Sequence, residues 1–191
     1  QLCRMMGEEV KRKNLPFDIA CLDPTPQCPA SPFVKRQLVG NFKDKIKIRE
    51  LAGVSDVLTY EIELAGVEIL KELEEAGRVV HPSSKTLTII QDKYLQASFL
   101  DSHNIPVPKT IAVQSCKDIQ EGIKEIGLPV MLKARQGSYD GRGNFLISDL
   151  NDIGKALSKF CGRSLMLQKY VEFEKEISVI VARRASGEVQ T

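Results

Sequence analysis

The alternation of short apolar runs with amphipathic helical patterns constrains the fold of this chain more than any other feature. Strands that alternate with helices are typical of a mostly parallel α/β sheet, because each parallel connection needs a crossover. In order, the first half predicts a helix around residues 2–10, a strand over 17–22, a helix over 43–52, a strand over 55–63, a helix over 66–77, a strand over 78–80 and a helix from Ser83 or Ser84 to about Asn104.

Two closely spaced prolines, Pro106 and Pro108, follow this first half and predict a domain boundary. Proline ends a helix and stiffens a connector, so we expect one domain over 1–104 and a second over 105–191. The second half has α+β character, with a glycine-rich hairpin at its tip. Its expected elements are strand 109–113, a helix capped by Ser115, strand 130–134, strand 144–147, a helix from about Asn151, and two β-rich runs over 164–173 and 175–184.

The segment LKARQGSYDGRGN, residues 132–144, places three glycines among charged side chains. It is neither a Walker A loop nor a G-x-G-x-x-G loop. Backbone N–H groups freed by glycine suit a polyphosphate, with Arg135 and Arg142 beside them and Lys133 in the preceding strand. A mobile surface hairpin with solvated charges explains the same residues equally well, so the local sequence leaves both interpretations open.

Composition excludes several classes of function. The net charge of +2 is too small to favour a nucleic-acid surface, and no apolar run reaches the ~20 residues that span a bilayer. Two histidines and five cysteines without C-x-x-C spacing argue against a zinc site and are typical of reduced cysteines in a cytoplasmic protein. The chain starts at Gln1 inside a helical pattern, so a fragment or a chain with missing parts is expected.

The order of these motifs is similar to the 5-(carboxyamino)imidazole ribonucleotide synthase family (PurK type) of the ATP-grasp superfamily. The matching segments are QLCRMM, CLDPTPQCPAS, GNFKD, DVLTYEIE, HPSSKTLTIIQDKYLQ, IPVPK, LPVMLKARQGSYDGRGN and FEKEISVIVAR. The resemblance implies an α/β ATP-grasp fold. A Rossmann-like pre-ATP-grasp domain is followed by the small α+β ATP-grasp subdomain, and the C-terminal part is absent or incomplete.

The resemblance also implies an ATP-dependent carbon–nitrogen ligase of purine biosynthesis. Such an enzyme carboxylates 5-aminoimidazole ribonucleotide with bicarbonate through carboxyphosphate. Another ATP-grasp ligase and a catalytically silent nucleotide-binding fragment remain alternatives. A cytoplasmic homodimer is expected, and no residue is expected to act as a covalent nucleophile.

By the same resemblance, Lys133 and Lys93 contact the ATP phosphates, and Glu176 binds the ribose hydroxyls. The lid over the triphosphate comprises Ser138, Tyr139, Asp140, Gly141, Arg142, Gly143 and Asn144. The hinge that receives adenine comprises Gln168, Lys169, Tyr170 and Val171.

The sequence departs from the family pattern at two places. Cys3 replaces a glycine near the expected ribonucleotide phosphate, and Gln168 replaces a glutamate whose role its amide oxygen can keep. Glu61 and Glu63 match an E-x-E strand end near the substrate cleft, which a solvated strand terminus explains equally well. The ligands for Mg²⁺, and the basic groups for bicarbonate and the ribonucleotide, are expected beyond residue 191.

Overall fold

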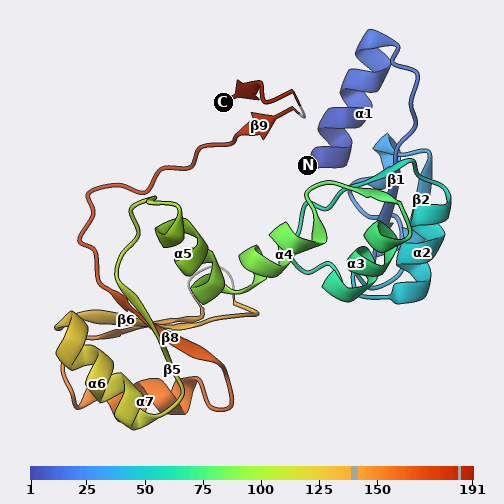
Figure 1. Ribbon diagram of the computed structural model, residues 1–191. Coiled ribbons are helices and arrows are strands. Elements are labelled where there is room, and N and C mark those ends of the chain that lie inside the picture. Colours follow the sequence, from blue (N-terminus) through green and yellow to red (C-terminus); the bar gives the residue numbers. More distant parts are fainter. Residues whose placement is uncertain (139–141, 185) are drawn as a thin grey trace.

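The computed structural model describes residues 1–138, 142–184 and 186–191. Figure 1 shows the N-terminal elements at one end of the molecule and a larger sheet at the other, with two helices, α4 and α5, between them. No helix in this described part of the chain is long and apolar enough to cross a bilayer.

The N-terminal elements form two short parallel strand pairs covered by helices. Strand β1 pairs with β2, and β3 pairs with β4, both in parallel, as the alternating pattern predicts. The elements are α1 (Leu2–Lys13), β1 (Ala20–Asp23), the 3₁₀ helix η1 (Ser31–Phe33), β2 (Arg36–Val39), α2 (Lys45–Gly53), β3 (Val57–Leu58), α3 (Val67–Glu75), β4 (Val79–Val80) and α4 (Ser84–Gln91). Their shared core consists of Ile48, Ala52, Leu58, Ile69, Leu70, Leu73, Val80 and Leu87.

Two sequence predictions fail in this region. The strand expected over 55–63 contains only Val57 and Leu58, and β2 was not predicted. Strand β2 follows a proline-rich segment, and its residues gain a strand partner only when β1 lies beside them, in the register Cys21 to Gln37. Pairing between segments that far apart is a tertiary contact, which local patterns do not report.

The helix expected from Ser83 to about Asn104 is two helices. Helix α4 ends at Gln91, α5 runs from Lys93 to Ser102, and Asp92 lies between them with extended backbone angles. The Asp92 carboxylate accepts hydrogen bonds from the N–H groups of Tyr94 and Leu95, so it is the N-cap of α5. The apolar pattern continues across this residue, which is why the break was not predicted.

The C-terminal half is built on one four-stranded antiparallel sheet in the order β5-β8-β6-β7. Strands β6 and β7 are consecutive and pair directly, which confirms the predicted glycine-rich hairpin. The elements are β5 (Thr110–Val113), α6 (Cys116–Ile126), β6 (Val130–Ala134), β7 (Asn144–Ile147), α7 (Asp152–Lys159) and β8 (Leu165–Lys169). Helix α6 begins at the predicted Ser115 cap, which forms a capping box with Asp118.

Helices α6 and α7 cover one face of this sheet, whereas α5 lies on its other side (Figure 1). Residues in β6 alternate, so that Val130, Leu132 and Ala134 are buried against the helices and Met131 and Lys133 point the other way. The core between sheet and helices consists of Val113, Ile119, Ile123, Val130, Leu132, Ala134, Ile147, Ile153, Ala156, Phe160, Leu165 and Leu167.

After β8 the chain leaves the sheet as an extended segment (Figure 1). The β-rich run expected over 175–184 contains strand structure only in β9 (Ala182–Arg183), which pairs with β10 (Val189–Gln190). Ile177 and Ile180 are 84% and 88% exposed. Residues 175–184 have the composition of a strand. Within the described residues, however, no apolar surface covers the side chains of Ile177 and Ile180.

Candidate functional site

The face of the sheet that α6 and α7 leave uncovered collects the predicted site residues. Cross-strand partners lie on the same face of a sheet. Lys133 in β6 is opposite Asn144 in β7 and Met166 in β8, and Gln168 in β8 is opposite Thr110 in β5. Residues predicted from separate motifs are therefore neighbours in space.

Lys133 is half-buried and lies near two further charged groups. Burial disfavours its ammonium, and the positive charge of Lys93 repels it, so the pKa of Lys133 is lowered despite the opposing effect of Glu176. Lys93 and Glu176 therefore both lie within electrostatic reach of Lys133. Two cations with one nearby carboxylate suit a polyanionic ligand that also carries hydroxyl groups.

Lys93, the first residue of α5, contacts the start of the glycine loop directly. Its Nζ donates to the carbonyl oxygen of Ser138 at 3.1 Å, and its backbone N–H donates to the carbonyl oxygen of Arg135 at 2.9 Å. The resemblance predicted Lys93 at the same pocket as Lys133, and the charge of Lys93 is close enough to Lys133 to lower its pKa.

The neck of the loop, Arg135–Ser138 with Arg142–Asn144, is closely packed. A Cβ atom on Gly143 would overlap the side chain of Ser138, so this position requires glycine. Arg163 donates to the carbonyl oxygen of Gln136 at 2.5 Å and to Ser138 Oγ at 2.6 Å. The predicted lid residues Tyr139, Asp140 and Gly141 lie outside the described residues, whereas Arg142 is exposed and Gly143 is buried.

Asn144 joins the loop to β7. Its backbone carbonyl oxygen accepts from Lys159 Nζ at 3.0 Å. Its side-chain Oδ1 is buried and, within the described residues, has no hydrogen-bond partner. A buried acceptor without a partner is unusual in a folded protein, and this one belongs to the residue opposite Lys133 in the sheet.

The predicted hinge lies where β8 ends. Gln168 Nε2 donates to Thr110 Oγ1 at 3.3 Å, which leaves its amide oxygen as an acceptor. The backbone N–H of Lys169 donates to Lys109 O at 2.8 Å, and that of Tyr170 donates to Pro129 O at 3.4 Å. Within the part of the chain that the structure describes, the Val171 N–H has no partner, so it can bind a planar ligand edge.

Lys169 itself points to a different part of the molecule. Its Nζ donates to the carbonyl oxygens of Ile126 and Gly127 at 3.3 and 3.5 Å, at the C-terminus of α6. A cation there is favoured by the helix dipole. In the hinge, Lys169 therefore contributes backbone groups rather than its charge.

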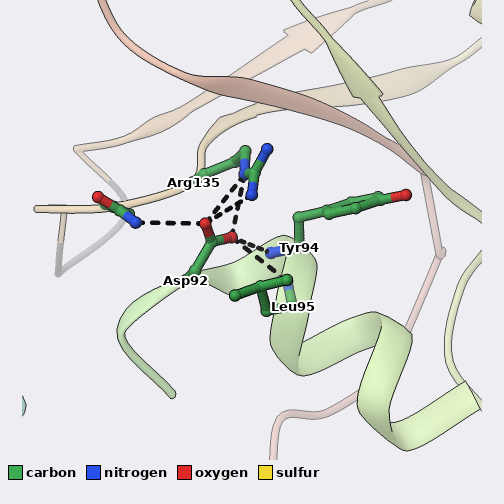
Figure 2. A network of polar contacts seen from close by, with 5 residues as sticks. Asp92, Tyr94, Leu95 and Arg135 are labelled. Carbon is green, nitrogen blue, oxygen red and sulfur yellow. Dashed lines mark hydrogen bonds and ion pairs between the residues drawn. The ribbon is translucent and has the colours of Figure 1, made fainter. Parts of the chain in front are cut away.

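Arg135, which the sequence grouped with the phosphate-binding candidates, is instead bound to Asp92. Its Nε and Nη2 donate to the two carboxylate oxygens at 2.7 to 3.1 Å, and Gln136 Nε2 donates to Oδ2 at 3.2 Å (Figure 2). Burial would raise the pKa of Asp92, but hydrogen bonds from Arg135 and from the amides of Leu95 and Tyr94 outweigh it, and the pKa is lowered. The guanidinium also lies 5.0 Å from the centre of the Tyr94 ring.

Sequence reasoning missed Asp92 and Arg163. An aspartate directly before a lysine-led helix is an N-cap signal, so Asp92 was detectable in QDKYLQ. No local pattern distinguishes Arg163 from a solvated arginine.

The second predicted site, at the start of α1, contains a carboxylate. Glu61 Oε2 accepts from the backbone N–H of Leu2 at 3.2 Å, so its charge lies at the helix N-terminus. The pKa of Cys3 is raised, first by burial and then by Glu61. The structure thus makes Glu61 and Cys3 neighbours. In the described part of the chain, no hydrogen bond links Glu63 to either residue.

Metal-binding geometry is absent from the described residues. Within the ranges 1–138, 142–184 and 186–191, no group of three or more His, Cys, Asp or Glu side chains is arranged to hold an ion.

Comparisons with known proteins agree with this geometry. A model of the ribonucleotide synthetase preATP-grasp domain matches residues 1–91, and a model of the ATP-grasp domain matches residues 98–191. The chain belongs to the ATP-grasp family. Both domains of this ATP-grasp chain, and their order, are those that the sequence resemblance implied.

Individual relatives show which type of ATP-grasp protein this chain is similar to. Phosphoribosylaminoimidazole carboxylase from Ogataea methanolica is 38% identical over 193 residues, which cover 99% of this chain and 35% of that protein. The structure of N5-carboxyaminoimidazole ribonucleotide synthetase from Thermotoga maritima is 39% identical, with a TM-score of 0.83 over 99% of this chain and 48% of that one. N5-carboxyaminoimidazole synthase from Aspergillus clavatus, solved with ADP and 5-aminoimidazole ribonucleotide, is 31% identical, with a TM-score of 0.85 over 99% and 49%. The predicted resemblance to this type of ATP-grasp protein is confirmed, and the chain spans half or less of the length of these relatives.

Proposed function

We propose that the protein carrying this chain uses ATP and bicarbonate to carboxylate 5-aminoimidazole ribonucleotide, forming 5-(carboxyamino)imidazole ribonucleotide in purine biosynthesis. The observation that carries the proposal is the convergence of Lys93 and Lys133 beneath the neck of the glycine loop, with Glu176 nearby. The names of the relatives supply the substrate class.

In this reaction a bicarbonate oxygen attacks the γ-phosphorus of ATP, ADP departs, and carboxyphosphate forms. The exocyclic amine of the ribonucleotide then attacks the carboxyl carbon, or CO₂ released from it, and inorganic phosphate leaves. Lys93 and Lys133 would neutralise charge on the transferring phosphoryl group. The residues 138–144 would cover the triphosphate and exclude water from carboxyphosphate.

The remaining residues would orient the nucleotide. The Gln168 amide oxygen and the Val171 N–H suit the adenine edge, with Lys169 and Tyr170 providing the backbone between them. Glu176 would accept from the ribose hydroxyls. Mg²⁺ would enter with the triphosphate and neutralise part of its charge.

Three organisational features stay predictions. These are the domain boundary between residues 104 and 105, a homodimer, and a cytoplasmic location. The boundary has support from the two prolines and from two separate apolar cores on either side of α5.

Phosphate release from ATP tests the proposal. With bicarbonate present, we expect 5-aminoimidazole ribonucleotide to accelerate phosphate release from ATP by the protein that carries this chain. An equal concentration of ribose 5-phosphate is the control and should have no effect. A rate of phosphate release that does not change on addition of 5-aminoimidazole ribonucleotide would contradict the substrate assignment. A protein that does not bind ATP would contradict the ATP site as well.

A further inference from the structure

A charged clasp joins the break between α4 and α5 to the neck of the glycine loop. The clasp is the ion pair between Asp92 and Arg135, whose side chains are 5% and 22% exposed. We propose that Asp92 and Arg135 are positioning residues that hold Lys93 and Lys133 together as one cationic site for nucleotide phosphates. This inference rests on the proposed function, and neither clasp residue is assigned a direct contact with the nucleotide.

The chain geometry explains how one ion pair can fix two lysines. Lys93 follows Asp92 directly, and Arg135 lies two residues beyond Lys133, just after β6 ends. Joining Asp92 to Arg135 therefore brings the start of α5 to the end of β6. The bond from Lys93 N–H to Arg135 O, at 2.9 Å, fixes the same register through the backbone.

The two lysines need such a restraint because they repel each other. Lys133 is half-buried, its ammonium is disfavoured by burial, and Lys93 adds a like charge. Glu176 opposes both effects but comes from the extended segment after β8, which is exposed. Without the clasp, α5 can move Lys93 away from Lys133 and relieve the repulsion.

Asp92 does more than cap the N-terminus of α5. Asp44 is the N-cap of α2 and accepts from the amides of Ile46 and Lys47 in the same way. Among the described residues Asp44 has no ion-pair partner, so the cap alone needs no arginine. Asp92 has the same cap bonds and, in addition, a two-oxygen contact with Arg135 and a bond from Gln136 (Figure 2).

The test replaces Asp92 by asparagine in the full chain, with Asp44→Asn as the matched control. Asparagine keeps an oxygen for the helix cap but removes the charge and the paired carboxylate oxygens. Two quantities are measured: the Kd for ATP, and the pKa of Lys133 from NMR titration of the labelled lysine side chains. The Lys133 signal is assigned by its loss in Lys133→Arg.

We expect Asp92→Asn to raise the Kd for ATP about tenfold, which corresponds to about 1.4 kcal/mol. We also expect the pKa of Lys133 to rise toward its ordinary value as Lys93 moves away. Asp44→Asn should change neither quantity, since a role confined to helix capping does not alter the ionisation of Lys133.

The outcomes separate the clasp from the proposed function. Wild-type protein that does not bind ATP contradicts the proposed function, whereas the pKa of Lys133 tests the clasp without nucleotide. An unchanged pKa and Kd in folded Asp92→Asn overturn the inference. If circular dichroism shows that Asp92→Asn is unfolded, Arg135→Lys decides, because it keeps the charge but loses the paired N–H donors; an unchanged Lys133 pKa in that variant also overturns it.

Discussion

The two faces of the β5-β8-β6-β7 sheet differ in what their side chains do, although the same strands form both. Toward α6 and α7, Leu132 and Leu167 are fully buried and belong to the apolar core. Toward the uncovered face, Lys133 and Gln168 are partly exposed and keep polar groups available. We therefore expect Leu132 to contribute to stability and Lys133, its neighbour in the strand, to contribute to nucleotide binding. Substitutions at these two positions test this expectation.

The largest effect is expected from the packed face. Leu132→Ala leaves a cavity in the core between β6 and the helices, so it should lower the free energy of unfolding by about 3 kcal/mol. Chemical denaturation monitored by circular dichroism measures this change. In the fraction that remains folded, the affinity for ATP should be close to that of the wild type. A selective loss of affinity at full stability would contradict the division between faces.

The next residue in the strand should behave in the opposite way. Lys133→Met keeps an unbranched side chain but removes the ammonium, so the Kd for ATP should rise roughly 30-fold, from the loss of about 2 kcal/mol. Stability should be unchanged or slightly higher, because a half-buried charge has been removed. Calorimetric titration with ATP and thermal unfolding of the same sample measure both. Unaltered ATP affinity in this variant removes Lys133 from the pocket.

The packed face was easier to predict from sequence than the clasp beside the uncovered face. Alternation in VMLKA and the Ser115 cap predicted β6, α6 and the hairpin because both signals are local. The apolar pattern continues across Asp92 and hid the break there, and the partner of its carboxylate, Arg135, is 43 residues away in the sequence. The resemblance supplied Lys93, Gln168 and Glu176, but local chemistry could not reveal that Arg135 pairs with Asp92 and that Lys169 caps α6.

Raising the pH should change ATP affinity and stability in opposite directions. The pKa of Lys133 is lowered in the folded chain, so affinity should fall as the pH rises through that lowered pKa, before free lysine would lose its proton. Over the same window the unfolded chain still binds the proton, so the contribution of Lys133 to stability should increase with pH. Below the lowered pKa both states are protonated, and the cost of burying the charge is fully present.

Parallel ATP titrations and denaturation curves between neutral and alkaline pH check these opposite signs. Lys133→Arg is the control, because a guanidinium stays charged throughout that range and should keep its affinity. If affinity and the Lys133-dependent part of stability fall together, the charge of Lys133 does not act as described.

The smallest effect is expected at the hinge, where Gln168 stands in place of the family's usual glutamate. Thr110 Oγ1 accepts from Gln168 Nε2 and donates to Pro108 O at 2.8 Å, so a glutamate at 168 would lose the contact with Thr110. Gln168→Glu should lower the free energy of unfolding by about 1 kcal/mol and change the Kd for ATP by less than about threefold. Thr110→Val should have a similar effect on stability.

Combining Gln168→Glu with Thr110→Val decides whether this bond is the cause. The two variants break the same bond, so the double variant should be little less stable than either single variant in a double-mutant cycle. Additive losses would mean that the Gln168–Thr110 bond contributes nothing to the hinge. A tenfold rise in the Kd for ATP in Gln168→Glu would have a different meaning. Glutamine and glutamate both offer an oxygen acceptor, so such a rise would show that the neutral amide of Gln168 recognises the adenine edge.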